Sequence, residues 1–310
     1  LRGRKMGDTV RAVNAWTGEH FGTLATASRL GLKVGHAVSG VLGDNFLGRI
    51  SGGAWKKDMP HAGKSPVART TQGDPVVYFP TCGGRIFGPS STDEAQLGDV
   101  ILEVLIRAGY APILPEGFDK LCCGQMLASK GMADEADGMS RTLEAALMKA
   151  SANGKYPVIM DASTCSVRMQ KHLDGRLKLY DFHEFANDAL LPRLMLSKQP
   201  GPIALHVNCS VKKSGSDAKL RTLLAACVEE IIEPAGVTCC GFAGDRGFVV
   251  PELNQHALRK IHDELPANCA CGVSTNRTCE IGLTAETGRT YRSIAYLLEE
   301  CSRKESNLTC

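Results

Sequence analysis

The sequence predicts an α/β fold in which two pseudo-repeated β-α-β halves form parallel sheets, preceded by a short helical segment. Two observations carry this prediction. From residue 75 onward, short apolar runs alternate with longer stretches of helical spacing, a pattern typical of parallel β-α-β units. One cysteine pattern, Cys…Cys-Cys-Gly…Cys, also occurs twice, and an internal repeat of this length indicates a duplicated structural unit.

The repeated pattern accounts for eight of the thirteen cysteines in the chain. In the first copy, the single cysteines lie 40 residues before and 42 residues after the adjacent pair. In the second copy, these intervals are 30 and 39 residues. The order is kept while the intervals vary, as expected for a repeat with loops of different length. The eight residues are Cys82, Cys122, Cys123 and Cys165, followed by Cys209, Cys239, Cys240 and Cys279.

The elements of each half follow from its apolar runs and from helical periodicity. In the first half we expect strands at 76–79, 111–114 and 157–160, and helices at 92–108, 132–152 and 181–191. In the second half we expect strands at 203–206, 231–232 and 270–274, and helices at 217–230, 251–264, 277–286 and 291–301. Every repeat cysteine follows a strand or lies in the loop after one. Because ligands of open parallel sheets bind at the carboxyl ends of the strands, we expect these cysteines to converge there.

Composition shifts divide the chain into three parts. Residues 1–74 form a helical segment and a glycine- and proline-containing linker, 75–196 the first repeat and 197–310 the second. Apolar residues at helical spacing within residues 8–50 predict two or three helices. Two interpretations of these helices stay open: docking onto the rest of the protein, or contact with a membrane surface through a basic amphipathic face.

The overall composition excludes several classes of protein. A net charge of +3 and an aromatic content of 5% do not indicate nucleic-acid binding. No run of 18 apolar residues is present, so the sequence predicts no membrane span. We expect a cytoplasmic protein.

Adjacent cysteines followed by glycine indicate metal ligands, because a disulfide between neighbours strains the peptide. Thiolates are the usual protein ligands of iron–sulfur clusters. Gly124 and Gly241, which follow the pairs, allow a sharp backbone turn and close approach to a cluster. We therefore favour an iron–sulfur site in each half. Zinc and a disulfide framework remain alternatives, although the cysteine and histidine spacings typical of structural zinc sites are missing and dense disulfides suit small secreted domains rather than a chain of 310 residues.

The duplicated pattern resembles the cysteine-rich CCG domain found in glycolate oxidase iron–sulfur subunits, in anaerobic glycerol-3-phosphate dehydrogenases and in heterodisulfide reductases. The stretch 239–248, together with 276–282 and 287–293, is most similar to the iron–sulfur part of FAD-linked D-lactate dehydrogenases. The resemblance covers roughly residues 75–300. In heterodisulfide reductases, further cysteines stand where this chain has Ala162 and Asn276, which argues against the disulfide chemistry of those enzymes.

The resemblance implies an iron–sulfur electron-transfer domain or subunit of a flavin-dependent D-2-hydroxyacid dehydrogenase, of the D-lactate or glycolate type. One or two [4Fe-4S] clusters would be held by the eight repeat cysteines, with no residue acting on the hydroxy acid itself. The implied partners are an FAD-containing domain or subunit and a ferredoxin-like iron–sulfur segment, neither of which this sequence contains. The acceptor is expected to be a quinone or another carrier, with a peripheral position at the inner membrane. A catalytic iron–sulfur subunit like that of heterodisulfide reductases is the alternative.

The loops after the two cysteine pairs differ. The second loop, 241–247, is rich in glycine and contains Asp245 and Arg246, whose charges we expect to offset each other. It offers more backbone N–H donors to sulfur, so it predicts tighter cluster binding at the second site. His206 and Arg277 join these two as candidates for contacts around the clusters.

Overall fold

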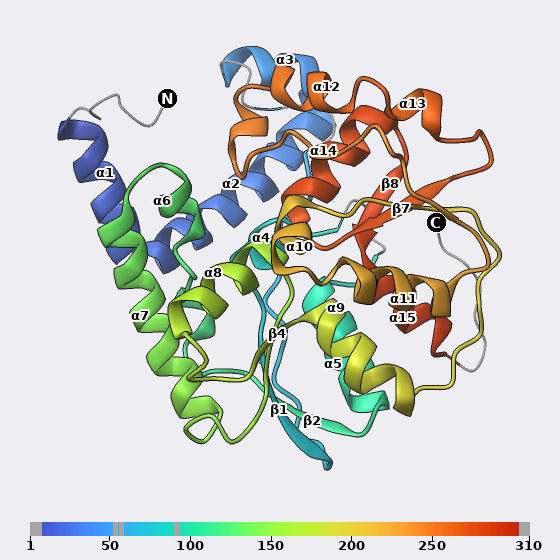
Figure 1. Ribbon diagram of the computed structural model, residues 1–310. Coiled ribbons are helices and arrows are strands. Elements are labelled where there is room, and N and C mark those ends of the chain that lie inside the picture. The colour runs from blue at the N-terminus through green and yellow to red at the C-terminus, as the bar shows by residue number, and fades with distance from the viewer. Residues whose placement is uncertain (1–7, 52–54, 56–58, 90–93, 304–310) are drawn as a thin grey trace.

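The computed structural model describes residues 8–51, 55, 59–89 and 94–303, and it consists of two four-stranded parallel sheets with helices on both faces (Figure 1). The strand order is β2-β1-β3-β4 in the first sheet and β6-β5-β7-β8 in the second. The same order in both halves confirms the predicted α/β duplication with parallel sheets.

The first sheet contains β1 (Asp74–Phe79), β2 (Tyr110–Ile113), β3 (Val158–Met160) and β4 (Leu179–Asp181). Its larger helices are α5 (Leu97–Arg107), α7 (Ala133–Ala150) and α8 (Ser163–Leu173). Shorter elements are α4 (Cys82–Ile86), η1 (Phe118–Lys120), α6 (Gln125–Ser129), α9 (Phe182–Phe185), η2 (Ala186–Leu190) and η3 (Leu191–Arg193).

The second sheet contains β5 (Ile203–Leu205), β6 (Ile231–Ile232), β7 (Cys271–Ser274) and β8 (Thr290–Ser293). Its helices are α10 (Cys209–Ser214), α11 (Asp217–Cys227), η4 (Arg246–Phe248), α12 (Glu252–Leu258), α13 (Ile261–Glu264), α14 (Arg277–Thr287) and α15 (Ile294–Cys301). The expected single helix at 251–264 is thus divided into α12 and α13.

The two halves share one hydrophobic core between the sheets. Alternate residues of β1 point to opposite faces, so that Val76 and Tyr78 enter the shared core while Val77 and Phe79 face α7 and α8. In β5, Ile203 and Leu205 enter the same shared core. Helices α5, α9, α11 and α15 fill this layer, and the pairing of α5 with α15 joins the halves.

Three helices precede the first sheet: α1 (Asp8–Glu19), α2 (Phe21–Leu42) and α3 (Asp44–Ile50). They confirm the predicted helical segment. Helix α1 lies beside α7, and α2 contacts α4 and η1 (Figure 1). Phe21 and Ala25 of α2 belong to the same core cluster as Cys122 and Cys123, so the interpretation that these helices dock onto the protein is confirmed.

The structure also corrects other predicted elements, including the helix expected at 181–191, which is α-helical only over Phe182–Phe185. Residues 291–293, expected to begin a helix, pair with β7 as strand β8. Strand β4 stands where no element was expected before the helix at 181–191, and α8 fills a stretch to which the sequence pattern assigned no structure. The helix expected over 92–108 begins only at Leu97, because the described residues 94–96 are not helical. Thr92 and part of the expected linker fall outside the described residues. No described helix is both long and apolar enough to cross a membrane.

Candidate metal centres

Each of the four single cysteines lies just beyond the carboxyl end of a strand, and the two adjacent pairs lie in the loops that follow β2 and β6. Cys82 and Cys209 are the first residues of α4 and α10, which follow β1 and β5. Cys165 and Cys279 lie in the first turns of α8 and α14, which follow β3 and β7. Helix N-termini favour negative charge, because their backbone N–H groups and dipole point toward it. The fold therefore presents single cysteines at positions that suit thiolates.

The first four cysteines come together. The Sγ atoms of Cys82 and Cys122 are 3.7 Å apart. Cys123 contacts both Cys122 and Cys165 through its thiol, so the four form one continuous group. Cys122, Cys123 and Cys165 are buried, and Cys82 is half-buried. Residues separated by up to 83 positions in the chain thus meet at one sheet edge.

The second four cysteines form a matching group. The Sγ atoms of Cys240 and Cys279 are 3.0 Å apart, and Cys239 contacts both Cys209 and Cys240. Unlike their counterparts in the first group, Cys209 and Cys239 are exposed to solvent, while Cys240 and Cys279 are buried. The second group therefore lies at the surface and the first lies inside.

The electrostatics of the two groups suit a bound cation. Contact with Cys123, together with burial, raises the pKa of the Cys122 thiol to about 12. Hydrogen bonds from Cys209 and Cys240 lower the pKa of Cys239 to about 2, so one thiolate is held by protonated neighbours. Four neighbouring thiols in a low-dielectric site cannot all ionise unless positive charge is bound among them. Four thiolates are a donor set of iron–sulfur clusters, and the residues fit such a group.

Within the described ranges, no three His, Cys, Asp or Glu side chains are arranged to hold one metal ion. The fit to a group containing several irons rests on the two sets of four thiols.

The glycine after each pair has the same role in both halves. The N–H groups of Gly124 and Gly241 each donate to the sulfur of the first cysteine of the pair, Cys122 or Cys239, at 3.4 Å. Both glycines have left-handed backbone conformations, with φ of 79° and 70°. A Cβ atom would lie 2.3 Å from a helix carbonyl oxygen, that of Ala136 in α7 in the first half and that of Leu253 in α12 in the second. Glycine is therefore required for close packing against that helix.

Arg85 ties together the two loops that hold Cys82 and Cys122. Its buried guanidinium donates to the carbonyl oxygen of Pro80 at 2.9 Å, and to those of Asp119 and Leu121 at 2.6 Å each. Sequence reasoning missed this residue, since an arginine three positions after a cysteine carries no recognisable signal.

Asp161 and Arg168 complete the framework of the first site. The Asp161 carboxylate at the end of β3 accepts hydrogen bonds from the Tyr78 hydroxyl at 2.7 Å and the Thr81 N–H at 2.8 Å, just before Cys82. Burial raises the pKa of Asp161, although these hydrogen bonds oppose the shift. Arg168, on the helix that carries Cys165, donates to the carbonyl oxygen of Cys123 at 2.7 Å. Asp161 could have been found as the carboxylate that directly follows an apolar strand.

His206 is the clearest difference between the two halves. It stands three residues before Cys209, where the first half has Phe79 three residues before Cys82. Its ring is buried, Nδ1 lies 3.1 Å from the Ser274 hydroxyl, and Nε2 has no hydrogen-bond partner. Burial lowers the pKa of His206 to about 4, so the ring is neutral at pH 7. A buried ring nitrogen without a partner indicates a missing ligand or donor beside the second site.

The two sites lie close to the boundary between the halves. Ser163 bonds across this boundary, because its N–H donates to the Thr275 carbonyl at 3.0 Å and its hydroxyl contacts Asn208. The Thr164 hydroxyl donates to the Asn276 side chain at 3.1 Å, so the residues next to Cys165 and Cys279 touch. The corresponding loops of the two repeats therefore face each other.

Two charged residues named from the sequence also bridge the halves. Arg277 donates to the carbonyl oxygens of Phe87 and Gly88 in the first half. Asp245 forms an ion pair with Lys130 at 2.7 Å, which corrects the expectation that Arg246 would offset its charge. Arg246 is exposed.

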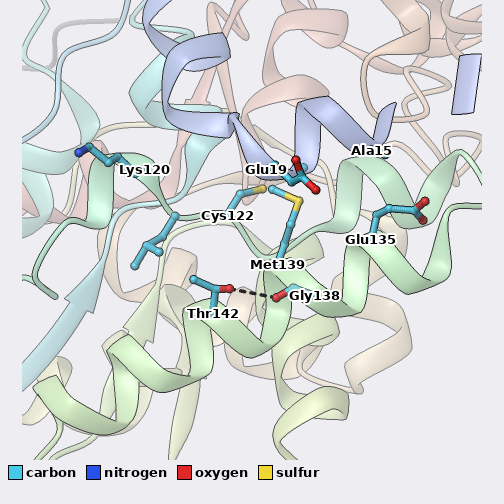
Figure 2. A pocket seen from close by; sticks show the side chains of 10 residues that line it. Ala15, Glu19, Lys120, Cys122, Glu135, Gly138, Met139 and Thr142 are labelled. Carbon is cyan, nitrogen blue, oxygen red and sulfur yellow. Dashed lines mark hydrogen bonds between the residues drawn. The ribbon is translucent and has the colours of Figure 1, made fainter. Parts of the chain in front are cut away.

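A pocket of about 390 Å³ opens beside the first site (Figure 2). It is lined by α1, α7 and the loop before Cys122. Figure 2 shows Cys122 beside Met139 in the pocket, with Lys120 on one side and Glu19 and Glu135 on the other. Cys122, which is only 3% exposed, thus forms part of the wall of this pocket.

Comparisons with known proteins agree with the repeat. The chain matches the model of the CCG cysteine-rich domain twice, over residues 76–170 and 203–284, which together make up more than half of it. It is 21% identical over 203 residues to lactate utilization protein A 1 of Bacillus mycoides strain KBAB4, covering 60% of this chain and 78% of that protein. It is 23% identical over 183 residues to lactate utilization protein A of Oceanobacillus iheyensis, covering 54% of this chain and 72% of that protein. With two copies of the domain in one chain, each bringing four cysteines together at a sheet edge, this protein belongs to the CCG cysteine-rich domain family.

Proposed function

We propose that this protein is the iron–sulfur electron-transfer part of a flavin-dependent D-2-hydroxyacid dehydrogenase of the D-lactate or glycolate type. In this role it receives electrons from reduced FAD on a partner domain or subunit and delivers them to a quinone or another acceptor. The observation that carries the proposal is the convergence of two equivalent groups of four cysteines at the same edges of two duplicated sheets.

The proposed ligands are Cys82, Cys122, Cys123 and Cys165 at the first site, and Cys209, Cys239, Cys240 and Cys279 at the second. A [4Fe-4S] cluster, when bound, supplies reversible one-electron transfer. The chain's own residues fix the environment. The N–H groups of Gly124 and Gly241 donate to sulfur, which stabilises negative charge there and raises a reduction potential.

The assignment to hydroxy-acid oxidation draws on the relatives. Both curated relatives are named for lactate utilization. The reaction on the hydroxy acid is assigned to the flavin partner, where the resemblance places it. A ferredoxin-like iron–sulfur segment is the proposed intermediate between the flavin and this chain.

Electron transfer is tested with the anaerobically reconstituted protein. Chemically reduced FAD is mixed with it in a stopped-flow instrument while iron–sulfur absorption and EPR signals are followed. We expect bleaching and a reduced-cluster EPR signal, both lost in a Cys122→Ser plus Cys239→Ser variant. The proposal fails if reduced flavin leaves the absorption unchanged although dithionite reduces the same sample.

The pocket beside Cys122 supports a second candidate, a heterodisulfide-reductase-like catalytic subunit, since it lets a small molecule reach the first site. Ala162 and Asn276, which replace cysteines of that enzyme, speak against it. Turnover of a small disulfide by the isolated, reduced chain at a rate that depends on Cys122 would favour this candidate over electron transfer alone.

A further inference from the structure

The two sites differ in how they meet the solvent. Cys209 and Cys239 of the second site are exposed, and their thiols contact each other. In the first site, three cysteines are buried and the fourth is half-buried. Another protein can therefore bring a redox centre closer to the second site than to the first. The surface around Cys209 and Cys239 is the shortest route for electrons between this chain and a protein partner.

Helix α10 presents two lysines on the same side as Cys209. Lys212 and Lys213 follow Cys209 by three and four residues, and residues at these spacings lie on one face of a helix. Both lysines are exposed, and Lys213 interacts electrostatically with the Cys209 thiol. Glu233, which also attracts Lys212, is bound to Arg221. Within the described part of the chain neither lysine forms an ion pair, so two uncompensated positive charges flank the exposed thiol.

The first half uses the equivalent positions differently. Arg85 and Ile86 follow Cys82 by three and four residues. Arg85 is buried and bonded to the carbonyl oxygens of neighbouring loops, and Ile86 packs against the core cluster of that half. The same two positions are therefore turned inward at the buried site and outward at the exposed site. In the second half they are free to contact another molecule.

The loop after the second cysteine pair adds apolar surface beside a further cation. Arg246 is exposed, and its carbonyl oxygen accepts hydrogen bonds from the N–H groups of Val249 and Val250 at 2.9 and 2.7 Å. Leu253 follows in the next turn, and its carbonyl oxygen lies against Gly241, directly after the cysteine pair. Val249, Val250 and Leu253 are 81%, 40% and 44% exposed. Apolar residues with a polar rim are the usual composition of a protein–protein interface.

Charge selects the kind of partner. Segments 209–215 and 239–250 contain three cations and one acidic residue, Asp245, which Lys130 neutralises in an ion pair at 2.7 Å. An acidic surface is therefore favoured, and a second copy of this surface is repelled. The exposed apolar residues are aliphatic, whereas helices that lie in a lipid surface typically add aromatic side chains. We call the six exposed residues the docking face: Lys212, Lys213, Arg246, Val249, Val250 and Leu253.

We propose that the docking face binds the acidic surface of an electron-transfer protein, and that electrons enter this chain at the second site. In each encounter one electron leaves the reduced centre of the partner and is taken up at the second site, with no bond made or broken. The proposal rests on the proposed function and deepens it, because it names which of the two sites faces the partner and what surface the partner has.

The probe is a plant-type [2Fe–2S] ferredoxin, an acidic one-electron carrier. Its reduced form is mixed anaerobically with the reconstituted full chain in a stopped-flow instrument. The rate of reduction should fall at least tenfold in Lys212→Glu plus Lys213→Glu, and should fall in the wild type as ionic strength rises. The matched control is Lys155→Glu plus Lys178→Glu, which changes the net charge equally at exposed positions before β3 and β4, away from the cysteines. It should react like the wild type.

Two further measurements locate the point of entry and the binding surface. In Cys239→Ser, dithionite should still produce the EPR signal of the first cluster, while reduction by ferredoxin becomes at least tenfold slower. Binding is measured without a cluster by the anisotropy of labelled, oxidised ferredoxin titrated with the iron-free chain. The Lys212→Glu plus Lys213→Glu variant should bind at least tenfold more weakly than the control variant.

Three results would overturn the proposal. The first is equal reduction by ferredoxin, or equal absence of it, in the docking-face variant and its control, with dithionite reducing both and circular dichroism showing both folded. The second is a dimer in sedimentation that the docking-face variant dissociates, which assigns the surface to a second copy. The third is cosedimentation with phosphatidylglycerol vesicles that this variant abolishes, which assigns it to a membrane. Failure of dithionite to reduce any sample counts against the proposed function instead, and the iron-free titration then decides the docking face by itself.

Discussion

Alanine at Gly124 should destabilise the protein and disturb the first site, through two separable effects. The glycine has φ of 79°, and a left-handed conformation costs an alanine about 1–2 kcal/mol. Its Cβ would also lie 2.3 Å from the carbonyl oxygen of Ala136 in α7, which is backbone and cannot rotate away. Forced overpacking of this kind costs about 1–3 kcal/mol. The expected loss for Gly124→Ala is therefore about 2–5 kcal/mol.

Gly117 provides a matched control in the same loop. Its φ is 66°, but nothing lies within 4 Å of the position of its Cβ. Gly117→Ala should therefore show only the conformational cost of about 1–2 kcal/mol. Gly241→Ala and Gly244→Ala form the corresponding pair in the second half, since a Cβ at Gly241 meets Leu253 and a Cβ at Gly244 meets no atom.

The assay is urea unfolding of the iron-free proteins under anaerobic, reducing conditions, with the free energy of unfolding obtained by linear extrapolation. Iron content after reconstitution is measured in parallel. The close-contact variants should lose more stability than their controls and retain less iron at the affected site. Equal losses for Gly124→Ala and Gly117→Ala, with full iron in both, would refute the argument that packing against α7 requires this glycine.

Three further predictions concern His206, Arg85 and the relative strength of the two sites. Burial lowers the pKa of His206 to about 4, against an ordinary value near 6.5, so between those values only the unfolded chain takes up this proton. The free energy of unfolding therefore falls as the pH drops, by about 2–3 kcal/mol at pH 4.5. His206, which Cys239 and Lys212 face, is replaced in His206→Phe, and this variant should lose that pH dependence in urea unfolding of the iron-free protein. If the free energy of unfolding changes with pH as steeply as in the wild type, the histidine is not its source. Arg85→Met leaves three buried carbonyl groups without their donor, so the free energy of unfolding in urea should fall by at least about 3 kcal/mol. The variant should also lose iron from the first site only. Equal loss of iron from both sites would contradict the local role of Arg85. The last prediction concerns which site binds iron more tightly: Cys209 and Cys239 of the second site are exposed while the first site is buried, which opposes the expectation from the glycine-rich loop. We expect the chelator-resistant iron to disappear in Cys123→Ser and to remain in Cys240→Ser. The reverse result would support the glycine-rich loop as the source of tighter binding.

Sequence alone predicted the duplication and the convergence of the cysteines, because both depend on rules that act locally. Short apolar runs such as 76–79 and 203–206, which stand between longer stretches of helical spacing, are typical of buried parallel strands. The rule that parallel strands end at one edge then brings Cys82 and Cys165 together. The glycines were predicted as turn residues, whereas their contact with Ala136 and Leu253 is a tertiary feature that only the packed helices reveal.

The fourth strand of each sheet could not be predicted in the same way. Strands β4 and β8 have three and four residues and include polar side chains such as Asp181 and Arg292. They are strands because they pair with β3 and β7, not because of their own propensity. The framework residues Arg85 and Arg168 were missed for a related reason, since their burial depends on loops that meet only in the folded protein.

The central claim is that two groups of four cysteines each hold an iron–sulfur cluster. The most direct measurement is the iron and acid-labile sulfide content of anaerobically reconstituted protein, with Mössbauer spectra of an ⁵⁷Fe sample. Two [4Fe-4S] clusters give about eight iron and eight sulfide per chain, falling to about four in Cys122→Ser or Cys239→Ser and to about none in the double variant. Zinc without iron, or iron that the double variant retains, would contradict the claim.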